Sequence, residues 1–211
     1  MDILPTVEDE TLALEIYRKF RRRPGAERIA SAFALAHLAA ILRQRRPRSV
    51  LEIGAGIGTV TALLLEHPSG VDRVVATENH PFCLEQLERN LDPGSRGRLR
   101  LVETEESFAE VEGPFDLLII DGNWNWPAVA ERLREGAVCF AEGQRRWERE
   151  ALDVALRRHR LGCAFDRYIQ GYRFVLDWRF RSPARRIAPL PRLRLGRRPV
   201  KGCWIGEVTP R

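Results

Sequence analysis

The sequence is poor in lysine, in closely spaced cysteines and in long apolar runs. Lysine supplies only two of its 35 basic residues, Lys19 and Lys201, so the other 33 are arginine. The four cysteines are far apart in the chain, so their spacing indicates neither a zinc site nor a disulfide framework. No run of about eighteen apolar residues occurs, which excludes a membrane-spanning helix. The first ten residues carry four acids and no base, unlike a secretory signal. We therefore expect a cytoplasmic protein with reduced, mostly buried thiols and no membrane partner.

The composition fits one folded domain whose charge is unevenly distributed. A chain of 211 residues with 44 % apolar residues can bury a substantial core. The net charge is +6, and residues 179–211 contain nine arginines and one lysine against a single acid. Residues 103–112 contain five glutamates and no base. The basic segment could bind phosphate or an acidic surface, and a solvated segment is the simpler interpretation.

Apolar periodicity predicts a doubly wound α/β fold with a mostly parallel sheet. Two amphipathic helices are expected within residues 12–20 and 29–41, separated by a break at Arg21–Gly25. Further helices are expected over Thr59–Glu66, Pro81–Leu91, Pro127–Arg134 and Arg145–Arg160. Strands are expected over Ser49–Ile53, Arg73–Glu78, Arg98–Glu103, Phe115–Asp121 and Ala137–Ala141. The β-rich segments 163–180 and 200–208 have no helix between them, which predicts an antiparallel edge whose pairing the sequence leaves open. Residues 181–199, rich in Arg and Pro, are predicted to be a basic loop insertion.

The first strand is followed by a glycine-rich turn, in the segment SVLEIGAGIGTVTALLLE. Ligands of such sheets bind at the carboxyl ends of the strands, so this turn is the expected site. The dinucleotide fingerprint needs glycine or alanine where Thr59 stands, and a phosphate-binding Walker loop needs a Gly-Lys-Ser/Thr that is missing. Gly54 and Gly56 would let the backbone approach a ligand closely.

Two acids show what kind of ligand this turn suits. Glu52 precedes the glycines, and its carboxylate would repel a pyrophosphate but attract an ammonium group. Glu78 ends the second strand, where an acid can accept hydrogen bonds from both ribose hydroxyls. The pair favours a cationic group near Glu52 and a ribose near Glu78, with no phosphate between them.

These motifs resemble those of the class I S-adenosylmethionine (SAM)-dependent methyltransferases, which have a Rossmann-like fold. The segments VLEIGAGIGTVT, VVATEN, RLRLVETEES and FDLLIIDGN follow the order and spacing of that family over roughly residues 28–143. Within the family, the sequence most resembles small O-methyltransferases of the catechol and caffeoyl-CoA type. The resemblance implies a helical lead-in over residues 1–47 and a SAM-binding domain over residues 48–211.

The resemblance also assigns roles to individual residues. The glycine turn would line the methionine part of SAM, Glu52 would lie near its amino group, and Glu78 with Asn79 would bind the ribose. Asp121 would lie beside the methionine part and the acceptor, whereas Asp116 is interpreted as structural. Glu105, flanked by Thr104, stands where the family often has an acid beside the adenine, and the start of a surface helix is the competing interpretation. The expected cofactor-binding residues are Glu52, Gly54, Ala55, Gly56, Gly58, Glu78, Asn79, Thr104, Glu105 and Asp121.

The catalytic groups are less well defined. Similar O-methyltransferases hold a divalent cation with an acid ending the fourth strand and an Asp-Asn pair ending the fifth. Here those positions are Asp121 and Glu142-Gly143, and glycine offers no ligand atom, so a metal is not expected. Asp121 and His80 are the candidate catalytic groups. Trp124 and Trp126 either stack on the acceptor or cap the core.

The leading hypothesis is a SAM-dependent methyltransferase that acts on a small molecule at oxygen. One alternative is an RNA or protein methyltransferase that uses the basic C-terminal segment. The other is a non-catalytic protein of the same fold that binds a nucleoside or a partner. A homodimer is possible, because the O-methyltransferases that the sequence resembles often form oligomers.

Overall fold

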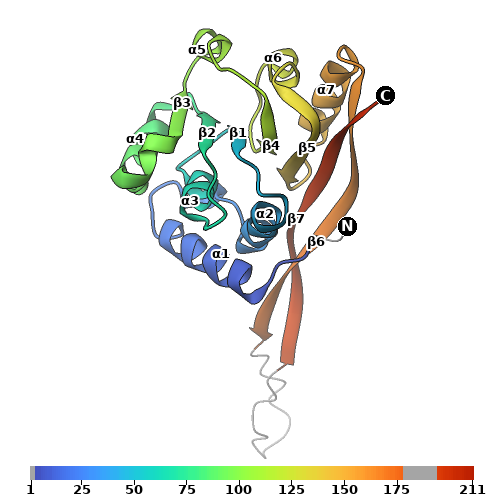
Figure 1. The fold of residues 1–211 in the computed structure, drawn as a ribbon. Coiled ribbons are helices and arrows are strands. Elements are labelled where there is room, and N and C mark those ends of the chain that lie inside the picture. Colours follow the sequence, from blue (N-terminus) through green and yellow to red (C-terminus); the bar gives the residue numbers. More distant parts are fainter. Residues whose placement is uncertain (1–2, 178–193) are drawn as a thin grey trace, which may run out of the picture.

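The computed structural model describes residues 3–177 and 194–211. Seven strands form one mixed sheet: β1 (Ser49–Ile53), β2 (Arg73–Thr77), β3 (Leu99–Val102), β4 (Phe115–Ile120), β5 (Leu133–Glu142), β6 (Leu161–Asp177) and β7 (Arg194–Pro210). Their order across the sheet is β3-β2-β1-β4-β5-β7-β6 (Figure 1). The strands β1 to β5 pair in parallel, and β7 runs antiparallel between β5 and β6. The predicted doubly wound sheet with an antiparallel C-terminal edge is confirmed.

Helices cover both faces of the sheet. The α-helices are α1 (Val7–Phe20), α2 (Ala32–Arg45), α3 (Thr59–Glu66), α4 (Pro81–Asn90), α5 (Glu105–Ala109), α6 (Trp126–Ala130) and α7 (Arg146–Arg157), with short 3-10 turns η1 (Ala26–Arg28) and η2 (Pro93–Arg98). Side chains of β4 alternate between two cores: Leu117 packs with residues of α1 to α4, and Leu118 with residues of α5 to α7. This alternation explains why β4 is apolar at nearly every position.

Some expected boundaries were wrong, and one helix was missed. The helix predicted over Pro127–Arg134 ends at Ala130, because Leu133 is buried and begins β5 opposite Phe115. The helix predicted to reach Arg160 ends at Arg157. Helix α5 was not expected as a separate element, although the competing interpretation of Glu105 as a helix start is confirmed.

The C-terminal strands are long and adjacent in space. Figure 1 shows β6 and β7 running together past the rest of the sheet. The predicted loop insertion 181–199 is corrected at its end, because residues 194–199 belong to β7. Residues 178–193 lie outside the described part of the chain. The division at residue 47 stays a prediction, since α1 and α2 share one core with the sheet.

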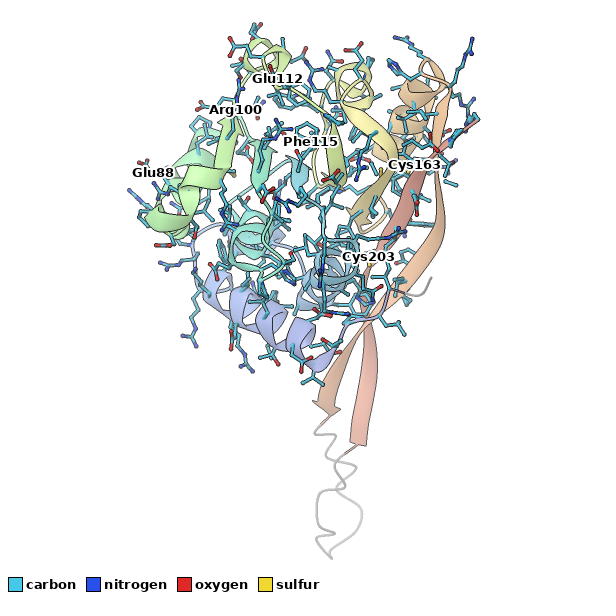
Figure 2. The ribbon with its side chains drawn as sticks, viewed as in Figure 1. Glu88, Arg100, Glu112, Phe115, Cys163 and Cys203 are labelled. Carbon is cyan, nitrogen blue, oxygen red and sulfur yellow. The ribbon has the colours of Figure 1, made fainter. Side chains whose placement is uncertain are left out.

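The cysteines agree with the expected pattern of unpaired thiols. Cys139, Cys163 and Cys203 are buried and Cys83 is half-buried, and all four are free. Cys163 and Cys203 are labelled on the two C-terminal strands in Figure 2. In the part of the chain that the structure describes, no helix is long and apolar enough to cross a membrane.

Candidate functional site

A cavity of about 550 Å³ opens where the strand order reverses, at the carboxyl ends of β1, β2 and β4. The turn after β1, the turn after β2, the turn after β4 and the segment between α1 and α2 form its walls. Its volume is in the range of small-molecule sites. The site residues predicted from the sequence that line it are Gly54, Ala55, Gly56, Glu78, Asn79, His80, Asp121 and Trp124.

The glycine turn approaches the turn after β4 at backbone contact distance. Gly54 has φ = 88°, and a Cβ placed on it would lie 2.9 Å from the backbone nitrogen of Gly122. Gly56 has φ = 55°, and a Cβ there would meet no atom within 4 Å, because this residue borders the open cavity. Gly58 (φ = 92°) is the N-cap of α3, and its Cβ position faces Leu87 instead. A direct contact between Gly58 and a cofactor therefore stays a prediction.

Glu78 ties two of the cavity walls together. Its Oε2 accepts a hydrogen bond from the backbone N–H of Gly56 at 2.7 Å. Its Oε1 accepts from the N–H groups of Asn79 (3.0 Å) and His80 (2.9 Å). Three backbone donors fix the carboxylate in the cavity wall and occupy three of its four lone-pair sites, which leaves one on Oε2 for a hydroxyl group of a ligand.

Glu52 lies beneath the glycine turn and does not line the cavity. Its side chain is 1 % exposed, and its Oε2 accepts a hydrogen bond from the Thr61 hydroxyl at 2.7 Å. Burial raises the pKa of Glu52 to about 8, and the negative charges of Asp121 and Glu78 add to this. Its Oε1 is buried with no hydrogen-bond partner. The predicted contact with an amino group is not tested by this geometry, and the carboxyl is protonated at neutral pH.

Asp121 at the end of β4 forms an ion pair with Arg145, the residue before α7. Burial raises the pKa of Asp121 to about 6, and the Arg145 guanidinium opposes the shift while Glu142 adds to it. Both partners line the cavity. Asp116 at the other end of β4 accepts hydrogen bonds from the N–H groups of Arg48 and Ser49 and pairs with Arg134, in keeping with a structural role.

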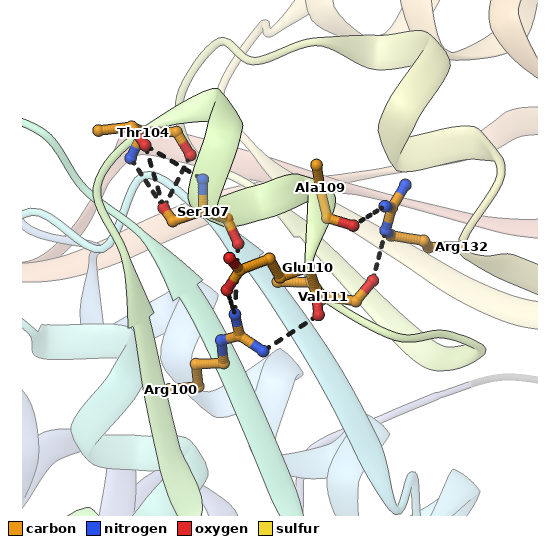
Figure 3. Close-up of polar contacts among 7 residues, drawn as sticks. All are labelled: Arg100, Thr104, Ser107, Ala109, Glu110, Val111 and Arg132. Atoms are coloured by element: carbon orange, nitrogen blue, oxygen red, sulfur yellow. Dashed lines mark hydrogen bonds and ion pairs between the residues drawn. The ribbon is translucent and has the colours of Figure 1, made fainter.

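A second cavity of about 420 Å³ adjoins the first and shares Asn79, Asn123 and Trp124 with it. Its other walls include Thr104 and Glu105 at the start of α5. Thr104 caps this helix, since its hydroxyl accepts from the Ser107 N–H at 3.1 Å (Figure 3). Glu105 accepts a hydrogen bond from the Asn125 side chain at 3.1 Å. The structure thus brings the predicted adenine-side residues next to the predicted ribose-side residues.

Side chains from other elements fix helix α5, whose first residues line the second cavity. Arg132 donates to the carbonyl groups of Ala109 and Val111, and Arg100 pairs with Glu110 (Figure 3). The Arg132 guanidinium also lies 5.0 Å from the centre of the Phe108 ring. Because α5 has only five residues, these contacts rather than helix propensity keep it folded.

Two of the remaining candidates differ in where they lie. Trp126 is 6 % exposed and belongs to the core, whereas Trp124 lines both cavities and packs edge-on against Phe108. The core-capping interpretation is confirmed for Trp126, and it fits Trp124 as well, because that ring is partly buried against the same core. Stacking of Trp124 on an acceptor stays a prediction. His80 is at the cavity rim as the N-cap of α4, with its ring 6.4 Å from that of Phe82, and its catalytic role stays a prediction.

The residues expected at a metal position do not fit a divalent cation. The Asp121 carboxylate is engaged by Arg145, and Glu142 accepts a hydrogen bond from the Ser31 N–H at 3.0 Å. Gly143 supplies no side-chain ligand. Among residues 3–177 and 194–211, no group of three or more His, Cys, Asp or Glu side chains comes together as a metal would require.

The sequence did not reveal that two arginines and the segment between α1 and α2 line the cavity. Arg28 and Arg145 line it together with Glu27, Ile29 and Ala30. Gly25 packs so closely on Phe82 and Ile57 that an added Cβ would lie 2.8 Å and 2.9 Å from them, which holds this segment against the glycine turn and α4. Among 33 arginines no sequence signal distinguishes Arg28 or Arg145.

Known proteins of similar structure share the fold of this chain, and their names give different methyl acceptors. No protein-family model and no curated protein sequence matches the chain. Among solved structures, the O-methyltransferase from Bacillus cereus in complex with S-adenosylhomocysteine (SAH) is 15 % identical with a TM-score of 0.52, covering 97 % of this chain and 93 % of that one. The C-terminal domain of precorrin-6Y C5,15-methyltransferase from Rhodobacter capsulatus is 18 % identical with a TM-score of 0.56, and both chains are covered completely. A candidate RNA methyltransferase from Pyrococcus horikoshii is 14 % identical with a TM-score of 0.59, covering 95 % and 98 %. The chain thus has the Rossmann-like fold of class I methyltransferases.

Proposed function

We propose that this chain is a SAM-dependent methyltransferase that methylates a small molecule at oxygen. The observation that carries the proposal is the position of Glu78. Its carboxylate lines the first cavity and is fixed by the Gly56 N–H on one side and by Asn79 and His80 on the other. The neighbouring Asn79 lines both cavities. A ribose bound there would direct its adenine towards Thr104 and Glu105 and its other end towards the glycine turn.

Charge favours a sulfonium compound over a nucleotide with phosphates. Three acids, Glu27, Glu78 and Asp121, line the first cavity together with two arginines, Arg28 and Arg145. Because Asp121 is paired with Arg145, Glu78 is the carboxylate that would act on a ligand beside the glycine turn, repelling a pyrophosphate and attracting a sulfonium or ammonium group. The methyl group would then be transferred near Asp121, where Arg145 and Trp124 also face the cavity.

Methyl transfer needs little from the protein besides alignment. The carbon attached to the sulfonium is already electrophilic, so placing the acceptor in line with the S–CH3 bond supplies much of the acceleration. A base is needed only when the acceptor is protonated. This explains why the cavity can serve the reaction without a nucleophile–base pair of the hydrolase type.

Isothermal titration with SAM tests the donor. We expect saturable binding to the wild type, weakened about 10- to 100-fold in Glu78→Ala, because hydrogen bonds to a charged group contribute about 1.5–3 kcal/mol each. Glu88→Ala is the matched control, since Glu88 is an exposed acid on α4 (Figure 2). Absence of heat at millimolar SAM would refute the proposal.

Turnover separates the remaining alternatives. A non-catalytic protein would bind SAM without producing SAH from any acceptor in a broad panel. An RNA methyltransferase would show RNA binding that falls steeply with salt. The described residues give no observation that favours either alternative over a small-molecule acceptor.

A further inference from the structure

One charged side chain of the cavity wall has no partner. Arg28 ends the short turn η1, is exposed and lines the first cavity. Its guanidinium makes no hydrogen bond and no ion pair with residues 3–177 and 194–211. The other arginine of the wall, Arg145, is paired with Asp121 and lies 3.5 Å from Glu148. Of these two cations, Arg28 is therefore the one available to a charged group of a ligand.

The segment that carries Arg28 is anchored at both ends. At one end, an added Cβ on Gly25 would lie 2.9 Å from the Ile57 side chain, so this residue packs directly on the glycine turn. At the other end, the N–H of Ser31 donates to Oε1 of Glu142, at the end of β5, at 3.0 Å. Arg28 lies three residues from each anchor. Its backbone is thus held beside the cavity between the glycine turn and the end of β5.

The charges that face Arg28 come from its own segment, from the turn after β2 and from α4. Glu27 is exposed, lines the same cavity and forms no ion pair with Arg28 in the described part of the chain. Burial raises the pKa of the Cys83 thiol on α4, the charge of Glu78 adds to this, and that of Arg28 opposes it. Arg28 therefore acts on the side of the cavity where Glu78 lies, and its charge is not cancelled by a paired acid.

The glycine turn has already used most of its own N–H donors. The N–H groups of Gly54 and Ala55 both donate to the carbonyl of Thr77 on β2, at 3.1 Å and 2.9 Å. The N–H of Gly56 donates to Glu78 at 2.7 Å, and that of Gly58 donates back to the carbonyl of Ala55 at 3.0 Å. A backbone group that is bonded inside the protein is not free for an anion. An anionic group of a ligand beside this turn therefore needs a side-chain donor.

The methionine part of SAM carries such an anionic group. It has a sulfonium, an ammonium and a carboxylate group, so its net charge at neutral pH is positive by one. The cavity wall, with three acids against two arginines, has the opposite formal charge when all five are ionised. The two cationic groups suit the acids, whereas the carboxylate would be repelled by Glu78 unless a cation stood beside it. A guanidinium can bind a carboxylate through two parallel N–H bonds.

We propose that Arg28 binds the carboxylate of the methionine part and makes the site selective for donors that carry this group. The inference rests on the proposed function and names a specificity-determining residue on its donor side. The selection is against the decarboxylated form of SAM, which keeps the adenine, ribose, sulfonium and ammonium groups. Arg28 takes no part in the transfer of the methyl group.

Titration calorimetry with three SAH analogues tests the inference without turnover. The ligands are SAH, the analogue in which hydrogen replaces the carboxylate, and the analogue in which hydrogen replaces the amino group. The variants are Arg28→Ala and Arg28→Lys. Arg22→Ala is the matched control, because Arg22 is exposed in the same segment, has no partner among the described residues and does not line the cavity.

We expect the wild type to bind SAH at least about tenfold more tightly than the decarboxylated analogue, because hydrogen bonds between charged groups are the stronger ones. Arg28→Ala should weaken SAH by about the same factor and should not weaken the decarboxylated analogue. Arg28→Lys should recover part of the preference, since an ammonium group keeps the charge and loses the fork of two donors. The ratio of affinities for SAH and the deaminated analogue should be the same in Arg28→Ala and the wild type. Arg22→Ala should behave as the wild type.

Four results would overturn the inference while SAM binding still supports the proposed function. The first two are a wild type without preference for the carboxylate and an Arg28→Ala variant that retains the preference. The third is equal weakening of SAH and the decarboxylated analogue in Arg28→Ala, which would show a structural role. The fourth is a loss of preference in Arg22→Ala as large as in Arg28→Ala. A wild type that binds neither SAM nor SAH would instead overturn the proposed function, and with it this inference.

Discussion

Replacing three glycines in turn by alanine distinguishes an effect on stability from an effect on cofactor binding. Gly54, Gly56 and Gly70 all have positive φ, at 88°, 55° and 71°. An L-residue in this region costs roughly 1–2 kcal/mol, so each variant should lose at least about that much stability. Gly70 and Gly56 have no atom within 4 Å of an added Cβ, and their losses should therefore be similar. Gly54 should lose more, because its Cβ would lie 2.9 Å from the backbone nitrogen of Gly122 and cannot be relieved by a side-chain movement.

Cofactor binding should follow a different order from stability. Gly56 borders the cavity and Gly70 does not, so Gly56→Ala should weaken SAM binding while Gly70→Ala leaves it unchanged. Gly54→Ala should impair both properties. Thermal unfolding gives the stabilities, where about 1 kcal/mol corresponds to roughly 2–4 °C in Tm for a chain of this size, and titration calorimetry gives the affinities. Equal SAM affinity in Gly56→Ala and Gly70→Ala would refute the placement of the cofactor at this turn.

Two further predictions concern the buried acid beneath the turn. Burial raises the pKa of Glu52 from its ordinary value to about 8, so the folded state holds a proton that the unfolded state releases at lower pH. Stability should therefore fall between about pH 4.5 and pH 8, by at most about 1.4 kcal/mol per pH unit from this group. For Glu52→Gln, the free energy of unfolding measured with denaturant should not show this fall with pH. A difference in unfolding free energy between variant and wild type that is the same at every pH would contradict the assignment. Thr61→Val removes the hydrogen bond to Glu52 with little change in shape and should cost about 1–3 kcal/mol. The control Thr11→Val, which removes an exposed hydroxyl bonded to Val7, should cost much less, and equal losses would speak against a buried hydrogen bond.

The wall of the cavity formed by the turns after β1, β2 and β4 was predictable because backbone geometry determines it. A strand that ends in closely spaced glycines must turn sharply, and parallel strands bring their carboxyl ends to one edge. Gly54, Glu78 and Asp121 consequently meet although they are far apart in the sequence. The bounds of β1 and α3 followed from the same apolar pattern and are confirmed.

What escaped prediction depends on long side chains and tertiary contacts. Helix α5 is too short to show a periodicity and is held by Arg132 and Arg100 from other elements. The predicted helix after Pro127 stops early because Leu133 fits the core better as a strand residue opposite Phe115. No local pattern encodes such a choice, because it depends on a partner elsewhere in the chain.

Two walls of the cavity depend on different kinds of contact. The turns after β1 and β2, which form the proposed donor side, have conformations that need particular residue types. The Arg145 side depends on a chain of contacts that runs from Trp204 on β7 through Arg149 to the Gln144 carbonyl. A substitution in this chain can move the Arg145 guanidinium without touching the glycine turn. Under the proposed function, the two walls of the cavity can therefore vary independently of each other, because fold alone does not determine the acceptor.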